Sequence, residues 1–372
     1  MNNIIVLFGG RSVEHDISII TGLGVLNNIS HAYHAIPVYI DKEGEWWTGD
    51  NLFNIKSFQP FTKQKLNKCT LMPNNNSLII FTRFGKKQKP IYCAVNCLHG
   101  FNGEDGVMSG LLQLCNIPHT SQSVLCGALC MDKTITKQIL AYNKIKIVEY
   151  LKFEKNDYDK NKADILCQID KKISYPCIIK PTKLGSSIGI NVANNEWECE
   201  KNIEQALFFD NEILIEKYLA QNKELNIAVM QSENELVVSN IEEVQKSDNL
   251  YDFDKKYKDK EMQRTIPAEI PNTLKLTIQK TATKAYKALG CSSVARFDFL
   301  YSDKTLYLNE VNTIPGSLAC YLWKEPKLAF NVLIDKLIQN AVQNFAYNSK
   351  KELKYETDVL NNLVQNSFVM TK

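Results

Sequence analysis

The strongest constraint on the fold of this chain is a run of alternating polar and apolar residues in its C-terminal third. The segments VARFDFLY at 294–301 and TLYLNEVN at 305–312 follow the two-residue period of a half-buried strand, and the turn SDK separates them. The pattern therefore predicts an antiparallel β-hairpin with one strongly apolar face.

The polar face of this hairpin carries a candidate metal site. Arg296 and Asp298 share one face of the first strand, and Glu310 and Asn312 share one face of the second. Folding about the turn brings Asp298 opposite Glu310, so that two carboxylates and an amide oxygen would meet. These are hard oxygen donors suited to Mg²⁺ that bridges nucleotide phosphates. The alternative is a solvated polar face on which Arg296 forms a salt bridge.

A second candidate site is the loop KPTKLGSSIGI at 180–190, which follows a predicted strand. Its two serines stand between glycines, so backbone N–H groups can close on phosphate oxygens while Lys180 neutralises their charge. A loop this rich in small residues is also often a plain turn. The chain has neither GxxxxGK[ST] nor a GxGxxG after a strand, which disfavours both common nucleotide-binding folds.

The N-terminal segment predicts a parallel α/β domain. A strand at 4–8 runs through a Gly-Gly turn into a helix at 14–26, and further strands are expected at 35–40 and 94–98. The stretch between the last two reads as an insertion with short strands. Ligands bind at the carboxyl edge of such a sheet, where His99 follows its strand.

Beyond this domain, short β-like runs alternate with helices, which predicts an α+β lobe. The first run is expected at 145–151, and a later one at 212–216 ends on Glu216 and Lys217, with Glu224 a little further on. Such a connector can present a backbone edge to adenine and a carboxylate to ribose hydroxyls.

Length and charge limit the remaining classes. A chain of 372 residues fits two or three domains. Its 44 basic and 41 acidic residues leave a formal charge of +3 without a basic stripe, so nucleic acid is not an indicated partner. No window approaches the roughly 18 apolar residues that span a bilayer, and no signal peptide is evident. We therefore expect a cytoplasmic protein without membrane contact.

Eleven cysteines, an odd number in a long chain without a secretion signal, favour free buried thiols over a disulfide framework. Cys93 and Cys97 are four residues apart, and so are Cys126 and Cys130. No CxxC pair or matching histidine spacing accompanies them, so zinc binding is the weaker alternative.

Eight motifs follow one another in a fixed order: GGRSVEHDIS from residue 9, HGFNGEDG from 99, MDK from 131, the loop from 180, EKYL from 216, YDFDKKY from 251, RFD from 296 and EVNTIPG from 310. In this order, over about residues 3–340, they resemble the D-alanine–D-alanine ligases, ATP-grasp enzymes of bacterial cell-wall synthesis. The resemblance implies an α/β, three-domain ATP-grasp architecture, with an N-terminal parallel-sheet domain and two α+β lobes that enclose ATP.

The expected bounds are 1–121 for the N-terminal domain, 122–215 and 216–345 for the central and C-terminal lobes, 247–263 for a lid loop and 346–372 for a peripheral tail. The resemblance also implies the ligands of ATP. It assigns Mg²⁺ or Mn²⁺, as two ions, to Asp298, Glu310 and Asn312. Contacts with the phosphates, adenine and ribose are assigned to Lys133, Lys180, Ser187, Glu216, Lys217, Leu219, Glu224 and Lys256.

For the first D-alanine, the resemblance implies that Glu14 receives the ammonium group, with His99 nearby. Ser186 and Tyr257 would form a hydrogen-bonded network with Glu14. The carboxylate of this D-alanine would attack the γ-phosphate of ATP, which requires charge neutralisation and positioning. The lid would close first, because an acyl phosphate exposed to water hydrolyses.

The amine of the second D-alanine would then attack the acyl phosphate, with Arg296 and the backbone N–H near Gly316 stabilising the oxyanion. Where the family commonly has a serine and a leucine for the carboxylate of this substrate, the chain reads SLACYL, which gives that role to Tyr321 and Leu322. A ligase for D-serine or another small D-amino acid is therefore the alternative, followed by a nucleotide-binding regulator without turnover. The family also implies a homodimer.

Overall fold

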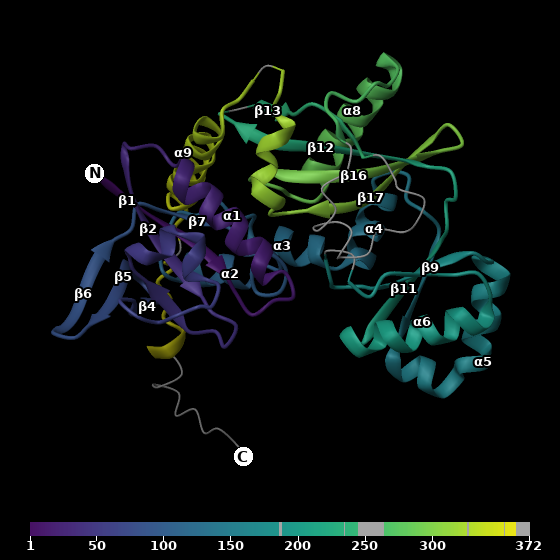
Figure 1. Cartoon of the computed structure of the whole chain (residues 1–372), viewed down its shortest axis with the longest axis horizontal. Helices are drawn as coiled ribbons and strands as arrows, with labels where there is room; N and C mark the ends of the chain where they lie inside the picture. The colour runs from purple at the N-terminus through teal and green to yellow at the C-terminus, as the bar shows by residue number, and fades with distance from the viewer. Residues whose placement is uncertain (186–187, 234, 245–263, 326, 353, 362–372) are drawn as a thin grey trace.

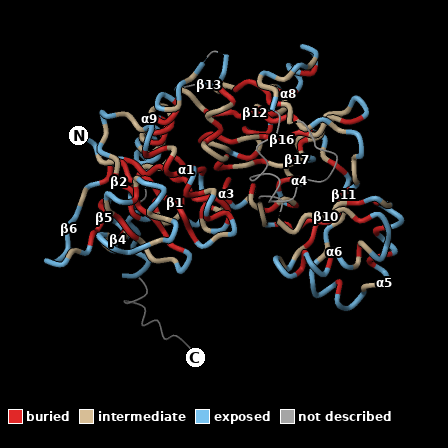
Figure 2. Tube along the Cα trace, viewed as in Figure 1, coloured by how far each residue is buried: buried red, intermediate tan, exposed pale blue. Residues whose placement is uncertain are grey.

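The computed structural model describes the chain except residues 186–187, 234, 245–263, 326, 353 and 362–372. Its described strands form three sheets, which Figure 1 shows as three lobes with α3 (Val124–Met131) and α4 (Lys133–Tyr142) between them. The interior of each lobe is buried, and exposed residues lie on the outer loops and helix faces (Figure 2). Among the described residues, no helix combines the length and apolar character needed to cross a membrane.

The N-terminal sheet has the strand order β6-β5-β4-β3-β2-β1-β7, and β1 runs parallel to both β2 and β7. A parallel strand between two neighbours is buried on both faces, which explains the apolar run IIVLF in β1. The segment expected as an insertion with short strands forms β3 to β6. These strands pair antiparallel one after another, starting from β2, and so extend the sheet. The bounds are β1 (Asn2–Gly9), β2 (Tyr33–Ile40), β3 (Trp46–Thr48), β4 (Asn67–Met72), β5 (Asn75–Thr82), β6 (Gly85–Pro90) and β7 (Cys93–Asn96).

Helices cover both faces of this sheet. α2 (Val107–Leu114) packs on one face, and α1 (His15–Asn28) packs on the other together with α9 (Phe330–Asn348). Leu333 and Leu337 of α9 share a core with β1, so this helix is part of the N-terminal lobe (Figure 1). The expected boundary between residues 345 and 346 falls within α9, and the domain bounds stay predictions.

The central sheet has the order β10-β9-β11-β8 and is antiparallel throughout. Two helices pack on one face of it in a single core. The strand expected at 145–151 begins only at Tyr150, because the preceding residues bridge two lobes: Leu308 N donates to Lys146 O and Lys217 N donates to Glu149 O. The bounds are β8 (Tyr150–Glu154), α5 (Lys155–Lys172), β9 (Cys177–Pro181), β10 (Asn191–Ala193), α6 (Glu196–Phe209) and β11 (Glu212–Lys217).

The C-terminal sheet has the order β15-β14-β12-β16-β17, with β13 paired to β12. The predicted hairpin is confirmed: β16 and β17 pair antiparallel, with Asp298 opposite Glu310. Its apolar face, including Phe297 and Phe299, packs in one core with Ile278 of α8, so the polar face points to the other side. The bounds are β12 (Lys223–Ser232), β13 (Glu235–Val238), β14 (Glu242–Val244), β15 (Arg264–Thr265), α8 (Asn272–Ala288), β16 (Ala295–Ser302) and β17 (Thr305–Asn312).

Candidate active site

A cavity of about 240 Å³ lies between the carboxyl edge of the N-terminal sheet and the polar face of the β16–β17 hairpin. Side chains from α1, from the loop after β7, from the hairpin and from the turn that follows it line this cavity. The predicted site residues among them are Glu14, His99, Arg296, Glu310, Asn312, Gly316 and Tyr321. The fold therefore brings residues from four of the sequence motifs to one place.

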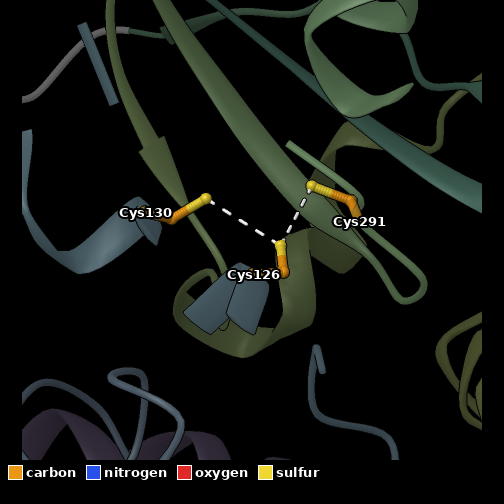
Figure 3. Close-up of side chains that lie close together, drawn as sticks. All are labelled: Cys126, Cys130 and Cys291. Atoms are coloured by element: carbon orange, nitrogen blue, oxygen red, sulfur yellow. Dashed lines mark hydrogen bonds between the residues drawn. The ribbon is translucent and has the colours of Figure 1, made fainter. Parts of the chain in front are cut away.

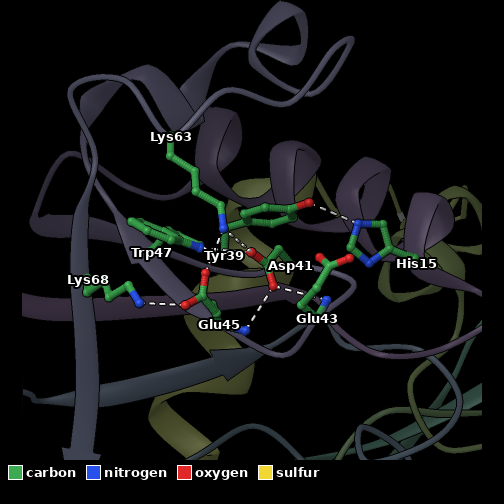
Figure 4. A network of polar contacts seen from close by, with 8 residues as sticks. All are labelled: His15, Tyr39, Asp41, Glu43, Glu45, Trp47, Lys63 and Lys68. Carbon is green, nitrogen blue, oxygen red and sulfur yellow. Dashed lines mark hydrogen bonds and ion pairs between the residues drawn. The ribbon is translucent and has the colours of Figure 1, made fainter.

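Glu14 stands at the N-cap position of α1, but its side chain makes no capping hydrogen bond. A buried polar network holds this end of the helix (Figure 4): His15 Nδ1 lies 2.6 Å from Gly10 O, and Nε2 lies 3.0 Å from the Tyr39 hydroxyl. Beside it, Asp41, Glu45, Trp47, Lys63 and Lys68 form a second set of polar contacts, in which the two lysines are exposed. The start of α1 at Glu14 is thus anchored by the buried contacts of the next residue, His15.

Two glycines lie directly against the carboxylate of Glu14. A Cβ atom on Gly100 would be 2.6 Å from Glu14 Oε2, and one on Gly185 would be 2.8 Å from the same oxygen. Gly100 also has a φ of 70°, which favours glycine. Since Gly185 belongs to the predicted phosphate loop, that loop meets the predicted ammonium-binding carboxylate.

His99 connects α1 to the turn after the hairpin. Its Nε2 lies 2.9 Å from Thr21 Oγ1, and the same hydroxyl accepts a hydrogen bond of 3.1 Å from Ser317 N in η3 (Gly316–Leu322). Burial lowers the pKa of His99 to about 4, so its imidazole is neutral at physiological pH. Thr21 was not predicted, because nothing in the helical pattern distinguishes it from a core position.

Glu104 is a second, partly buried carboxylate in the cavity, and the sequence pattern predicted no role for it. Its Oε2 accepts from Gly100 N at 2.8 Å and its Oε1 accepts from Ile314 N at 2.9 Å, so it joins the loop after β7 to the turn after β17. Burial, and then the charge of Glu14, raises the pKa of Glu104 to about 8. Its place within the HGFNGEDG motif was the available signal.

The hairpin donors fit a hard divalent cation. Asp298 accepts hydrogen bonds from Arg296 Nε and Nη2, each 2.7 Å, and one of 2.9 Å from Asn312 Nδ2. Carboxylate oxygens have further lone pairs, and Asn312 does not use its carbonyl oxygen in that bond. With Glu310 opposite Asp298, two carboxylates and an amide remain able to coordinate a cation that prefers oxygen.

A smaller cavity of about 40 Å³ shares Glu14, Glu310 and Asn312 with the first and extends to Lys133. Lys133 follows Asp132, whose side chain caps α4, and its Nζ donates to Leu184 O in the 180–190 loop. The structure thus places Lys133 between the predicted phosphate loop and the hairpin.

Lys180 and Glu216 form a buried cluster with Lys137. Glu216 is 1% exposed; its Oε1 lies 2.5 Å from Lys137 Nζ, and its other oxygen pairs with Lys180. Burial alone would raise the pKa of Glu216, but the two lysines lower it to about 2. Lys137 was missed, although it lies one helical turn after Lys133, which was the signal. The Glu216 carboxylate is therefore engaged by protein, whereas its backbone lies at the strand end.

The remaining predicted residues have different positions. Tyr321 lines the cavity and accepts a hydrogen bond of 3.2 Å from Arg296 Nη1, whereas Leu322 is fully buried in the core and does not line it. Arg264, which was not predicted, lies 5.2 Å from the Tyr321 ring centroid. Three predicted ATP contacts, Lys217, Leu219 and Glu224, lie on β11, β12 and the connection between them, outside both cavities. Ser186, Ser187, Lys256, Tyr257 and the predicted lid at 247–263 lie outside the described residues.

Comparison with known proteins identifies the family of the chain. Residues 3–122 match the family model for the D-ala D-ala ligase N-terminus, and residues 139–339 match the model for its C-terminus. A D-alanine–D-alanine ligase of Thermosipho melanesiensis is 37% identical over 97% of this chain and 98% of its own. The D-alanine–D-alanine ligase structure from Coxiella burnetii, at 23% identity, shares the fold over 98% of this chain and 99% of its own, with a TM-score of 0.81.

The VanG D-Ala:D-Ser ligase structure from Enterococcus faecalis is 29% identical, with a TM-score of 0.79 over 91% of this chain and 99% of its own. The family models and the Thermosipho relative together cover almost the whole sequence. The chain therefore belongs to the D-alanine–D-alanine ligase family, ATP-dependent ligases with the ATP-grasp fold.

Proposed function

We propose that the protein joins two D-alanines into D-alanyl-D-alanine, with conversion of ATP to ADP and phosphate, for peptidoglycan precursor synthesis. The observation that carries this proposal is that one cavity is lined both by Glu14, which Gly100 and Gly185 enclose, and by the hairpin residues Glu310 and Asn312. An acceptor for an ammonium group thus shares a cavity with donors for a phosphate-bound cation.

In the first step, Glu14 holds the ammonium group of one D-alanine so that its carboxylate faces the γ-phosphate. The carboxylate oxygen forms a bond to phosphorus while the bond to the β-phosphate oxygen breaks, and ADP leaves. Lys133 and Lys180 neutralise phosphate oxygens. Asp298, Glu310 and Asn312 would hold two divalent cations, Mg²⁺ or Mn²⁺. These would supply further charge neutralisation.

In the second step, the amine of another D-alanine attacks the carbonyl carbon of the acyl phosphate. Phosphate leaves, the amine loses a proton, and a peptide bond results. Arg296 stabilises the oxyanion, because Asp298 fixes its guanidinium plane and its Nη1 faces the cavity beside Tyr321. A backbone N–H near Gly316 assists, and Tyr321 binds the carboxylate of the second substrate.

The other predicted roles complete this proposal. The Glu216 backbone, Lys217 and Leu219 contact adenine, and Glu224 contacts ribose. Ser186 and Tyr257 would hydrogen-bond with Glu14, while Ser187 and Lys256 would contact the phosphates. We place the enzyme in the bacterial cytoplasm, where ATP is available, as a homodimer.

A second candidate is a ligase that takes D-serine as its second substrate. The specific observation is that Tyr321, with the Arg264 guanidinium against its ring, stands where the second substrate would bind. A phenolic hydroxyl there can hydrogen-bond a substrate hydroxyl as well as a carboxylate.

A phosphate-release assay tests both. The purified protein is incubated with ATP and Mg²⁺, and with D-alanine alone, with D-alanine plus D-serine, or with D-alanine plus D-lactate; the products are identified by mass spectrometry. We expect ADP and D-alanyl-D-alanine from D-alanine alone. A mixed D-alanyl-D-serine product in excess would favour the second candidate, and no ADP with any D-amino acid would refute a ligase.

A further inference from the structure

The structure brings a third cysteine to the pair on α3. The Sγ of Cys126 lies 3.9 Å from that of Cys130 and 3.5 Å from that of Cys291, which is 165 residues away in sequence (Figure 3). All three sulfur atoms lie within 4.8 Å of one another. Within the described residues, no histidine or carboxylate ligand atom belongs to this cluster.

These spacings match the coordination of a soft metal ion. Thiolates bind zinc at about 2.3 Å, so two of them on a tetrahedral ion are about 3.8 Å apart. A disulfide would require sulfur atoms about 2.0 Å apart, and all the cysteines of the chain are free. The three side chains therefore need little movement to enclose an ion.

One side chain, Gln122, makes three hydrogen bonds to the segment that follows Cys291. Gln122 Oε1 accepts hydrogen bonds from Ser292 N at 2.7 Å and Ser293 N at 3.0 Å, and its Nε2 donates to Val294 O at 3.0 Å. Because Gln122 directly precedes the N-cap of α3, it fixes the distance between that helix and Cys291. Such outer contacts orient the ligands of metal sites.

The helix N-terminus favours a thiolate at Cys126, and solvent can reach the cluster. Cys126 lies in the first turn of α3, behind the Ser123 cap, where backbone N–H groups stabilise negative charge. Cys126 and Cys130 are buried, whereas Cys291 is partly exposed and gives an ion access from solvent. Cys130 also lines the smaller cavity next to Lys133.

We propose that Cys126, Cys130 and Cys291 form a three-thiolate site for a soft closed-shell cation such as Zn²⁺, with solvent as the fourth ligand. Binding transfers the thiol protons to solvent and forms metal–sulfur bonds without any change of oxidation state. The ion links α3 to the segment that leads into β16, and so it stabilises the contact between them. α3 precedes Lys133, and the other segment precedes Arg296. This site has ligands different from the oxygen donors of the hairpin, and it does not depend on the proposed reaction.

The test is a titration of the reduced full chain with Cd²⁺ in excess Mg²⁺, so that the hairpin carboxylates are occupied. The charge-transfer absorbance of cadmium thiolates reports only sulfur ligands. A Cys167→Ser background removes the exposed thiol of α5. We expect one equivalent of Cd²⁺ per chain and loss of the band in Cys126→Ala, Cys130→Ala and Cys291→Ala. The matched control is Cys199→Ala, because Cys199 is hydrogen-bonded to Cys177 without a third thiol in that group.

A second measurement uses Zn²⁺ and thermal unfolding. Zn²⁺ should raise the unfolding temperature of the Cys167→Ser protein and of its Cys199→Ala variant, but not that of the Cys291→Ala variant. Circular dichroism checks that each variant is folded. If Cys126→Ala or Cys130→Ala on α3 does not fold, Cys291→Ser in the partly exposed loop replaces it in the test. An unchanged cadmium band in all three cluster variants would overturn the proposal. The proposal would also be overturned if the Cys167→Ser protein gave no cadmium band and lost two thiols on treatment with a small disulfide. That result would indicate that two of the cysteines form a disulfide instead.

Discussion

The carboxylate of Asp298 accepts hydrogen bonds from both Nε and Nη2 of Arg296, each 2.7 Å long. This fork fixes the plane of the guanidinium group. Burial alone would lower the pKa of Arg296, but the negative charge of Asp298 outweighs it and raises that pKa above its usual value. The remaining nitrogen, Nη1, is thereby directed to the cavity and to Tyr321. One residue of the hairpin thus positions the cationic group that the proposed second step requires.

Replacing Arg296 by lysine tests this role. A lysine keeps the charge but cannot form the fork, so we expect kcat to fall by about 10²–10³-fold, with the KM for ATP much less affected. Steady-state kinetics measure both. Arg83→Lys, at an exposed position of the first lobe, is the control and should leave kcat unchanged. A wild-type kcat for Arg296→Lys would exclude Arg296 from oxyanion stabilisation.

Gly185→Ala tests the enclosure of Glu14. The added methyl group would lie 2.8 Å from the carboxylate, and such overpacking costs about 1–3 kcal/mol. We expect kcat/KM for D-alanine to fall by about 5- to 150-fold, which kinetics with varied D-alanine measure. Gly24→Ala on α1 is the matched control, since its nearest atom would be 3.5 Å away. Equal kinetics for the two variants would show that Glu14 tolerates displacement.

Lys137→Met tests the buried cluster around Glu216. Removing one partner of a buried ion pair costs about 3–5 kcal/mol, because the carboxylate loses part of its compensation. We expect a lower unfolding temperature for this reason. We also expect a higher KM for ATP, because Lys180 would pair more closely with Glu216 and be less available to the phosphates. Lys152→Met removes a partly exposed pair with Glu212 on the same sheet and should cost at most about 1 kcal/mol. Equal unfolding temperatures for the two variants would contradict the prediction.

His99 makes stability depend on pH. Burial lowers its pKa from 6.5 to about 4, so between these values the unfolded chain binds a proton that the folded chain does not. The unfolding free energy therefore falls as pH falls through this window, by about 3 kcal/mol from this group.

Urea unfolding at several pH values, compared between the wild type and His99→Gln, measures this contribution. The slope of the unfolding free energy against pH should decrease in His99→Gln. His34→Gln, at an exposed position, should retain the slope of the wild type. Superimposable profiles for the wild type and His99→Gln would contradict the assignment.

Local patterns in the sequence predicted much of the fold. The hairpin with its register, the first parallel strand and helix, and most later strands follow from residue period and turn chemistry, which depend on neighbours along the chain. The strand expected at 145–151 was misplaced, because the part before Tyr150 bonds to β17 of the C-terminal lobe as well as to β11 of its own lobe. No local pattern carries that information.

The sequence by itself determined which chemical groups this protein possesses and their order, and hence its family. Only the tertiary structure decided which of them act together: Glu104 between Gly100 and Ile314, Lys137 beside Glu216, and Cys291 against Cys126. The physical reason is that burial, ion pairing and sulfur spacing depend on distances between segments that can be more than a hundred residues apart. Those distances exist only once the three sheets have packed around α3 and α4.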